Sequence, residues 1–292
     1  MLPIQGGILA GVPSQSRYLN FKLYEQKNLQ ECLWSLKKII DGSSAVLGLS
    51  GTIVSLYAEI EGLKSAEEIN ANGVYVPASD FDLWVWLREE DRGKIFHLSH
   101  TIVNALSPAF TLSLVDDGFK YLDGNELSGF KDGTENPTGD DAVEAAFIQD
   151  KIKGLYGSTF LATQKWKSNF DWLSGQSQQH KERLIGRSLI DDHEFENNHA
   201  SAHVSRTAQE SFDPEAFILR RSMPWVKGLD GGLMFVSFSK TLTAFEVQLN
   251  RMCGLDDGIV DGLFEFTKPV TNAYFWCPPF RTGALDLSLL GI

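Results

Sequence analysis

The chain has 292 residues, of which 43% are hydrophobic and 22% are charged. This composition excludes a disordered chain, a coiled coil and a disulfide-rich scaffold, and the length allows one large domain or two ordinary ones. Acidic residues number 38 against 26 basic ones, for a net charge of -12, so nucleic acid and anionic membranes would be repelled and are not expected as partners.

The first half of the chain predicts strands interrupted by two helices. Asn28 reads as the N-cap of a helix that runs to about residue 40, where Asp41 and Gly42 end it. Apolar residues at spacings of three and four predict a second helix over residues 93–106. Short runs of β-prone residues predict the strands, at residues 8–12, 18–23, 45–49, 53–57 and 82–87.

The second half repeats the alternation. Strands are expected at residues 160–165 and 232–238, and helices at residues 169–184 and 245–252. The apolar strands that contain Leu83 and Leu233 lie 150 residues apart (233 minus 83), close to half the chain length. This spacing predicts a duplicated α+β unit, in which an antiparallel sheet carries helices on one face and the boundary falls near residues 140–157.

The cysteines and the first residues of the chain indicate where in the cell the protein is expected. Cys32, Cys253 and Cys277 form no C-x-x-C pair, which fits a reduced cytosolic setting better than a zinc or redox site. The first residues lack the basic start and apolar run of a secretory signal, and no apolar run approaches the ~20 residues of a membrane helix. We therefore expect a cytoplasmic protein with no membrane association.

One loop is dense in turn residues. Residues 129–137 read Gly-Phe-Lys-Asp-Gly-Thr-Glu-Asn-Pro, which are residues typical of turns. Two interpretations are open: a surface loop in which Asp132 binds its own backbone, or a loop that holds this carboxylate at a fixed place. A phosphate loop is excluded, because no Lys-Ser or Lys-Thr follows the last glycine.

The histidines differ in their surroundings. His97 and His100 are expected on a helix surface and His180 in solvent. The acidic segment from Asp191 contains two more histidines and could be a cation-binding loop or a solvated loop. His203 stands between small apolar residues and could be a core side chain or a ligand. The arginines at positions 220 and 221 could likewise protect an edge strand against aggregation.

Taken together, the order and spacing of five segments resemble the dye-decolourising peroxidase family, and most closely its compact bacterial cytoplasmic branch. The segments are residues 129–137, Ile-Gly-Arg at 185–187, Ala-His-Val-Ser-Arg at 202–206, Ile-Leu-Arg-Arg-Ser-Met-Pro at 218–224 and Asp-Gly-Leu-Phe-Glu-Phe-Thr at 261–267. The resemblance implies two ferredoxin-like units, each an antiparallel sheet with helices packed outside. Residues 1–145 would carry the Asp132 loop, and residues 146–292 would bind one haem b per chain.

The resemblance also implies roles for single residues. His203 would be the iron ligand, and Asp261 would hydrogen-bond to its imidazole. Asp132 and Arg220 would lie on the opposite, distal side. Two further residues are expected to contact the cofactor: Ser222 in the same pocket as Arg220, and Arg206 at a haem propionate.

These roles imply a haem peroxidase that uses hydrogen peroxide to oxidise dyes, phenols and similar one-electron donors. Asp132 would move a proton and Arg220 would supply a fixed positive charge. One alternative is a protein that handles haem or porphyrin without turnover; another is a non-haem α+β protein whose acidic loop binds a cation. We also expect a homo-oligomer. The last residues, 287–292, are faintly similar to the peptide by which some relatives dock into an encapsulin shell.

Overall fold

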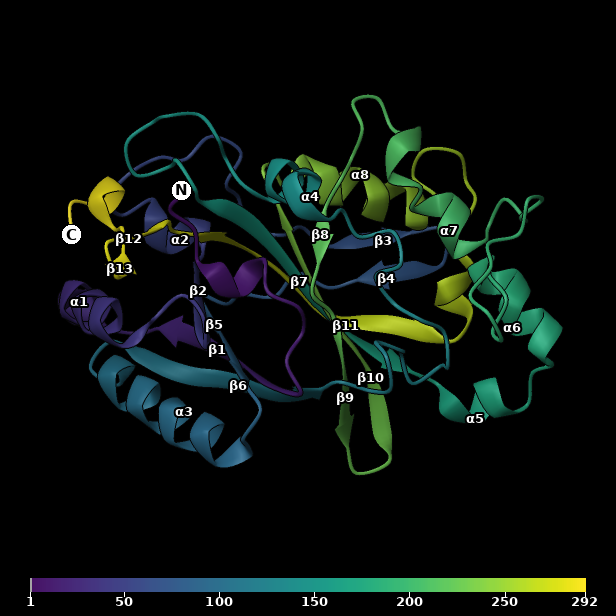
Figure 1. Ribbon diagram of the computed structural model, residues 1–292, viewed down its shortest axis with the longest axis horizontal. Helices are drawn as coiled ribbons and strands as arrows, with labels where there is room; N and C mark the ends of the chain where they lie inside the picture. The colour runs from purple at the N-terminus through teal and green to yellow at the C-terminus, as the bar shows by residue number, and fades with distance from the viewer. Residues whose placement is uncertain (1) are drawn as a thin grey trace.

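The computed structural model describes residues 2–292 and is a mixed α+β structure (Figure 1). The elements of the first half are β1 (Gln15–Leu23), α1 (Leu29–Ile39), β2 (Ala45–Leu49), α2 (Gly51–Val54), β3 (Ile69–Ala71), β4 (Val74–Val76), β5 (Leu83–Glu89), α3 (Arg92–Leu106) and β6 (Phe110–Phe119). Those that follow are α4 (Gly139–Ala146), β7 (Thr159–Ser168), α5 (Phe170–Ser174), α6 (Gln178–Ile185), α7 (His203–Arg206), β8 (Leu219–Arg220), β9 (Met223–Lys227), β10 (Asp230–Ser239), α8 (Thr243–Met252), β11 (Thr267–Cys277), β12 (Phe280–Arg281) and β13 (Ala284–Leu285).

One antiparallel sheet of nine strands organises the molecule, in the order β7-β11-β2-β5-β1-β6-β9-β10-β8. Because β10 also pairs with β7, the sheet closes on itself. It divides into two sets of four strands, β2-β5-β1-β6 and β9-β10-β7-β11. When the strands of each set are numbered in chain order, they lie side by side in the order second, third, first, fourth. This repeated order is the duplicated ferredoxin-like fold.

The two sets meet at two narrow seams. A single residue pair, Trp276 with Leu49, joins β11 to β2, and another, Gly118 with Trp225, joins β6 to β9. Within the sets the ladders are longer, with ten residue pairs between β11 and β7. The third strands, β5 and β10, contain Leu83 and Leu233, which agrees with the 150-residue spacing. The division into residues 1–145 and 146–292 stays a prediction.

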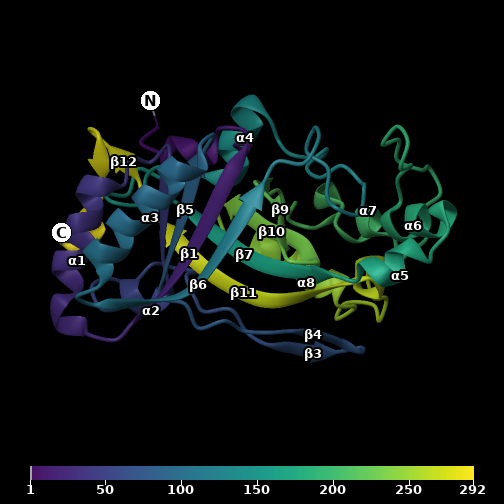
Figure 2. The same ribbon diagram turned by 90° about the horizontal axis from the view of Figure 1, so that it is seen from below.

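Alternation along the strands builds two cores. Successive side chains of a strand point to opposite faces of the sheet. The side chains on the outer face pack against the helices, and those on the inner face fill the space that the sheet encloses. The outer core contains residues of α1, α3 and α8, and Figure 2 shows α1 and α3 outside the first strand set. The enclosed core draws on both halves and includes the buried rings of Tyr18, Trp84, Trp86, Phe238 and Phe275.

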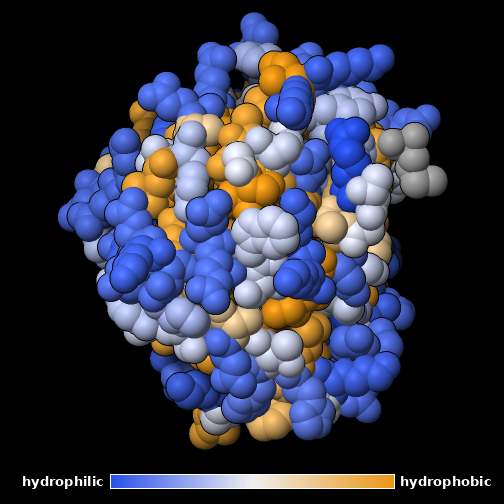
Figure 3. Space-filling view, turned by 90° about the vertical axis from the view of Figure 1, so that its left-hand side faces the viewer, coloured by the Kyte–Doolittle hydropathy of each residue, from blue (hydrophilic) through white to orange (hydrophobic). Residues whose placement is uncertain are grey.

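Two segments, one from each half, reach into the other half. The β3–β4 hairpin extends from the first half, and Asn72 Nδ2 at its tip donates to the backbone oxygens of Cys253 and Gly254. The segment after β13 returns to the first half: Nζ of Lys37 in α1 donates to the backbone oxygen of Ile292, and Leu287 and Leu290 are buried in the outer core. Figure 3 views the end of the molecule at the left of Figure 1, where hydrophilic residues surround smaller hydrophobic areas.

Three predicted elements are wrong. Residues 8–12 form no strand, because the side chains of Arg88 and Arg221 occupy the backbone oxygens of this segment. Residues 53–57 begin inside helix α2, whose N-cap Ser50 accepts from the amide of Ile53. The helix predicted over residues 169–184 is broken into α5 and α6, since Gly175 ends the first and Ser177 caps the second. Within residues 2–292, no helix is long and apolar enough to span a membrane.

Candidate functional site

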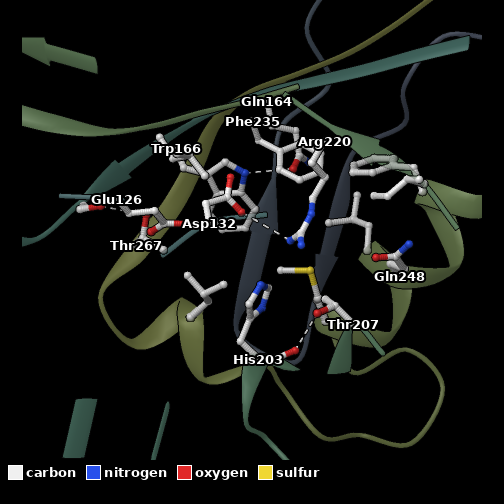
Figure 4. Close-up of a pocket in the computed structure, with 17 residues that line it drawn as sticks. Glu126, Asp132, Gln164, Trp166, His203, Thr207, Arg220, Phe235, Gln248 and Thr267 are labelled. Carbon is white, nitrogen blue, oxygen red and sulfur yellow. Dashed lines mark hydrogen bonds and ion pairs between the residues drawn. The ribbon is translucent and has the colours of Figure 1, made fainter. Parts of the chain in front are cut away.

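Two adjoining cavities lie where α7, α8 and β8 meet the second strand set, and Figure 4 shows the residues that line the first. Their empty volumes, open solvent at their mouths included, are about 680 Å³ and 1010 Å³. Both are lined by Glu126, Asp132, His203, Thr207, Arg220, Gln248 and Leu263. The first also has a wall of large apolar side chains from Ile218, Leu233, Phe235, Phe245, Leu249 and Met252. A mostly apolar space with a few convergent polar groups is typical of a cofactor site.

His203 projects into the cavity from the first position of α7. Its Nδ1 lies 2.8 Å from Oδ2 of Asp261, whose side chain is 0% exposed. The other carboxylate oxygen, Oδ1, accepts from the amide of Leu263 at 2.8 Å. A carboxylate at Nδ1 assigns the ring proton to that nitrogen and leaves Nε2 with a free lone pair. The predicted contact between His203 and Asp261 is therefore present.

Asp132 and Arg220 lie together on the side of the cavity opposite His203 (Figure 4). Oδ1 of Asp132 is 3.5 Å from Nη1 of Arg220, and both side chains are mostly buried. Nε of Arg220 is buried and has no hydrogen-bond partner within the described part of the chain. Of the two interpretations of the glycine-rich loop, the structure supports the second: the loop aims its carboxylate at an arginine.

Asn136 connects this loop to the strand that carries Arg220. Its Oδ1 accepts from the backbone amide of Arg220 at 2.7 Å, and its Nδ2 donates to the backbone oxygen of the same residue at 3.1 Å. One side chain therefore binds both backbone groups of Arg220, which sets the separation of Arg220 from Asp132. The sequence analysis did not single out Asn136; its place in the turn-rich loop was the signal available.

Glu126 is a second carboxylate that the sequence analysis missed. Asn125 pairs with Lys131 across the loop, and the amide of Glu126 donates to the oxygen of Phe130. Because faces alternate, Glu126 and Asp132 share one face of this narrow ladder. Burial, followed by the charge of Asp132, raises the pKa of Glu126 to about 7. The side chain is therefore readily protonated near neutral pH.

Two residues expected at the cofactor are absent from the linings of both cavities. Arg206 lines neither cavity; its guanidinium binds Asp257 and the backbone oxygen of Arg251. Ser222 is also absent from both linings, and its hydroxyl accepts from the amide of Val236. The structure thus gives no support to a propionate contact at Arg206 or to a pocket position for Ser222. Both cofactor contacts stay predictions that follow from the resemblance alone.

The other histidines and the acidic segment face solvent or bind elsewhere. His97, His100, His193 and His199 are exposed. His180 lies 3.3 Å from Glu265. In the acidic segment, Glu194 lies 2.6 Å from Arg187, which also binds Glu135 at 2.7 Å. Because Glu194 is already paired with Arg187, its carboxylate is not available to a bound cation, which disfavours a cation-binding loop.

The residues around the cavity fit a flat, apolar, iron-containing macrocycle. Apolar side chains could pack against it, His203 could offer an imidazole nitrogen as a ligand to its iron, and across the cavity Nε of Arg220 has no hydrogen-bond partner among residues 2–292. The donor set is wrong for a structural zinc ion, which takes four protein ligands. Haem therefore fits the residues present.

A family model described as "Dyp-type peroxidase, C-terminal" matches residues 123–282. Among curated proteins, "Dye-decolorizing peroxidase" of Mycobacterium tuberculosis is 33% identical over 208 residues, which cover 69% of this chain and 62% of that protein. The protein of the same name from Mycolicibacterium paratuberculosis is 31% identical, with 59% of its length covered. The chain thus spans roughly three fifths of the length of these curated relatives.

Solved structures match over nearly the whole chain. The dye-decolorizing protein of Vibrio cholerae is 25% identical with a TM-score of 0.87, covering 98% of both chains. The encapsulated DyP-type peroxidase of Mycobacterium smegmatis is 26% identical with a TM-score of 0.83, covering 93% of this chain and 94% of that one. A DypB variant of Rhodococcus jostii in complex with heme has the same fold, at 24% identity, a TM-score of 0.83 and coverage of 92% and 94%.

Proposed function

This chain belongs to the dye-decolourising peroxidase family, and from that premise we propose that it is a haem peroxidase. It would bind one haem b between the two sides of the cavity, with His203 as the iron ligand. Hydrogen peroxide would be the oxidant, and dyes, phenols and similar one-electron donors the reductants. The observation that carries the proposal is the Asp132–Arg220 pair facing His203 across an apolar cavity.

The residues divide the work by their chemistry. The bound haem would supply the iron that accepts peroxide and passes oxidising equivalents to the donors. Asp261 holds the proton on Nδ1 of His203, which keeps Nε2 facing the cavity and increases its electron donation. Asp132 takes the proton from the peroxide oxygen that binds and returns it to the oxygen that leaves. Arg220 stabilises the negative charge that develops there, because a guanidinium stays protonated throughout.

A haem-handling protein without turnover is the main alternative. It would need His203 and the apolar walls but would have no use for a carboxylate and a guanidinium held together on the far side. Asn136, which fixes both backbone groups of Arg220, also favours catalysis. The cation-binding alternative is weakened by the ion pairs of Glu194 and Glu135 with Arg187.

Location and assembly follow from the same proposal. Cys32, Cys253 and Cys277 are free and buried, which supports a reducing, cytoplasmic setting. The encapsulated relative makes an encapsulin shell a candidate partner. In this chain Leu287 and Leu290 are packed in the core, so docking through residues 287–292 would first require their release.

Absorption spectroscopy tests the proposal. The haem-reconstituted protein should show a Soret band that changes on addition of peroxide, and His203→Ala should lose stable haem or show an altered spectrum. His199→Ala is the matched control, since His199 is exposed in the preceding loop, and it should behave as wild type. A normal, unchanged spectrum in His203→Ala would refute the ligand assignment, and haem binding with no peroxide reaction would favour the haem-handling alternative.

A further inference from the structure

Arg206 is a buried arginine that joins α7 to two other segments. It lies one helical turn after His203, and its side chain is only 5% exposed. Its Nη1 and Nη2 form parallel hydrogen bonds to the carboxylate of Asp257, at 2.7 Å and 2.8 Å. Nε and Nη2 also donate to the backbone oxygen of Arg251 near the end of α8. Such a bidentate, charge-assisted pair fixes orientation as well as distance.

The loop that Arg206 holds is the one that ends in Asp261. Residues 253–261 connect α8 to a short 3₁₀ helix, Gly262–Glu265. Asp257 Oδ1 accepts from the amide of Ile259 at 2.9 Å, and the hydrogen bond from Arg206 lowers the pKa of Asp257 to about 2. The amide of Asp261 then donates to the oxygen of Met252 at 2.8 Å. The loop is therefore anchored in its middle and at its end.

We propose that Arg206 and Asp257 are positioning residues for the His203–Asp261 pair. The proposal rests on the proposed function, because only a ligand role for His203 makes that pair matter. Neither side chain lines the cavity. They act through the backbone, because the ion pair ties the Asp261 loop to the helix that begins with His203. The ion pair thereby fixes the relative position of His203 and Asp261, whose hydrogen bond measures 2.8 Å. A well-aligned carboxylate partner makes a ligating imidazole a stronger donor.

The Fe(III)/Fe(II) midpoint potential of the haem-reconstituted protein reports this alignment. Asp261→Asn should raise the potential, since a neutral amide pushes less charge onto the imidazole. Arg206→Gln and Asp257→Asn should each raise it by a smaller shift. Arg206→Lys, which keeps the charge but not the paired hydrogen bonds, should lie between wild type and Arg206→Gln. In the Asp261→Asn background, Arg206→Gln should add no further shift.

Asp256→Asn is the matched control. Asp256 is in the same loop and lies 3.9 Å from Arg251, so its replacement removes the same charge without breaking the Arg206–Asp257 pair. It should leave the potential unchanged. The haem-free protein gives an independent measurement, because the amide of Leu263 donates to Asp261. Hydrogen exchange of that amide should become about tenfold faster or more in Arg206→Gln, and should not change in Asp256→Asn.

The proposal is overturned by unchanged potential and unchanged Leu263 exchange in both Arg206→Gln and Asp257→Asn, or by shifts that add fully to that of Asp261→Asn. A lower melting temperature with an unshifted potential also counts against it, since that marks a purely structural pair. If the wild-type protein binds no haem, the proposed function fails, while the exchange measurement still decides whether Arg206 holds Asp261.

Discussion

Asp132 and Arg220 stand 3.5 Å apart, and their proposed roles in the peroxide reaction differ. Asp132→Asn should slow this reaction by ~10²- to 10⁴-fold, because an amide cannot take up and return the proton. Arg220→Leu should slow it by ~10²- to 10³-fold, because the positive charge is lost. Stopped-flow measurement of the peroxide step checks both variants. A wild-type rate in Asp132→Asn would assign the proton transfer to another group.

Glu126 predicts a pH dependence of stability in the haem-free protein. Its pKa is raised from 4.5 to about 7, so between these values the folded chain binds more protons than the unfolded chain, and the free energy of unfolding falls as pH rises. Glu126→Gln should remove this slope, which is up to ~1.4 kcal/mol per pH unit for one group. Urea unfolding between pH 4.5 and 7 measures it. Identical slopes in both proteins would contradict the raised pKa.

At the scale of elements, Asn136 holds the β6–α4 connection against β8. Asn136→Ala leaves the backbone amide of Arg220 without its acceptor, which should cost about 1–3 kcal/mol of unfolding free energy. The peroxide reaction should slow as well, because Asp132 loses its fixed distance from Arg220. Asn125→Ala is the control, because Nδ2 of Asn125 donates to the backbone oxygen of Gly129 within the same loop. Equal kinetic effects in the two variants would deny Asn136 a special role.

The sequence pattern predicted the regular helices and strands, but it did not predict where an apolar segment stays irregular. The strand at residues 45–49 and the helix at 93–106 were predicted almost to the residue, because a continuous apolar face leaves one arrangement that buries it. Residues 8–12 look equally apolar, yet Arg88 and Arg221 occupy their carbonyls from far along the chain. Local propensity contains no information about such partners.

The candidate site shows the same division. Four site residues could be predicted because each lies inside a motif that resembles one of the dye-decolourising peroxidase family: His203, Asp132, Arg220 and Asp261. The direction of the Arg206 side chain could not be predicted, because it depends on the Asp257 loop folding back onto α7. Glu126 was missed because its significance comes from the cross-loop pairing of Asn125 with Lys131.

At the scale of the whole molecule, the two halves share one enclosed core. Tyr18 and Trp84 come from the first half and Phe238 and Phe275 from the second, while the seams between the two strand sets of the sheet are single residue pairs. We expect the full chain to unfold in one cooperative transition, and fragments 1–145 and 146–292 to remain unstable apart. Calorimetry of the chain and circular dichroism of the fragments test this. Two separate transitions, or a stably folded fragment, would show independent domains.

The burial of Leu287 and Leu290 also orders events during synthesis. The first half leaves the ribosome early, but the outer core lacks these two side chains until residues 287–290 have been made. Until then the apolar surface that they cover is exposed, which is the condition under which nascent chains recruit chaperones or associate with one another. The hydrogen bond from Nζ of Lys37 in α1 to the backbone oxygen of Ile292 spans 255 residues of sequence, so the packing of this segment is one of the slow, non-local steps of folding.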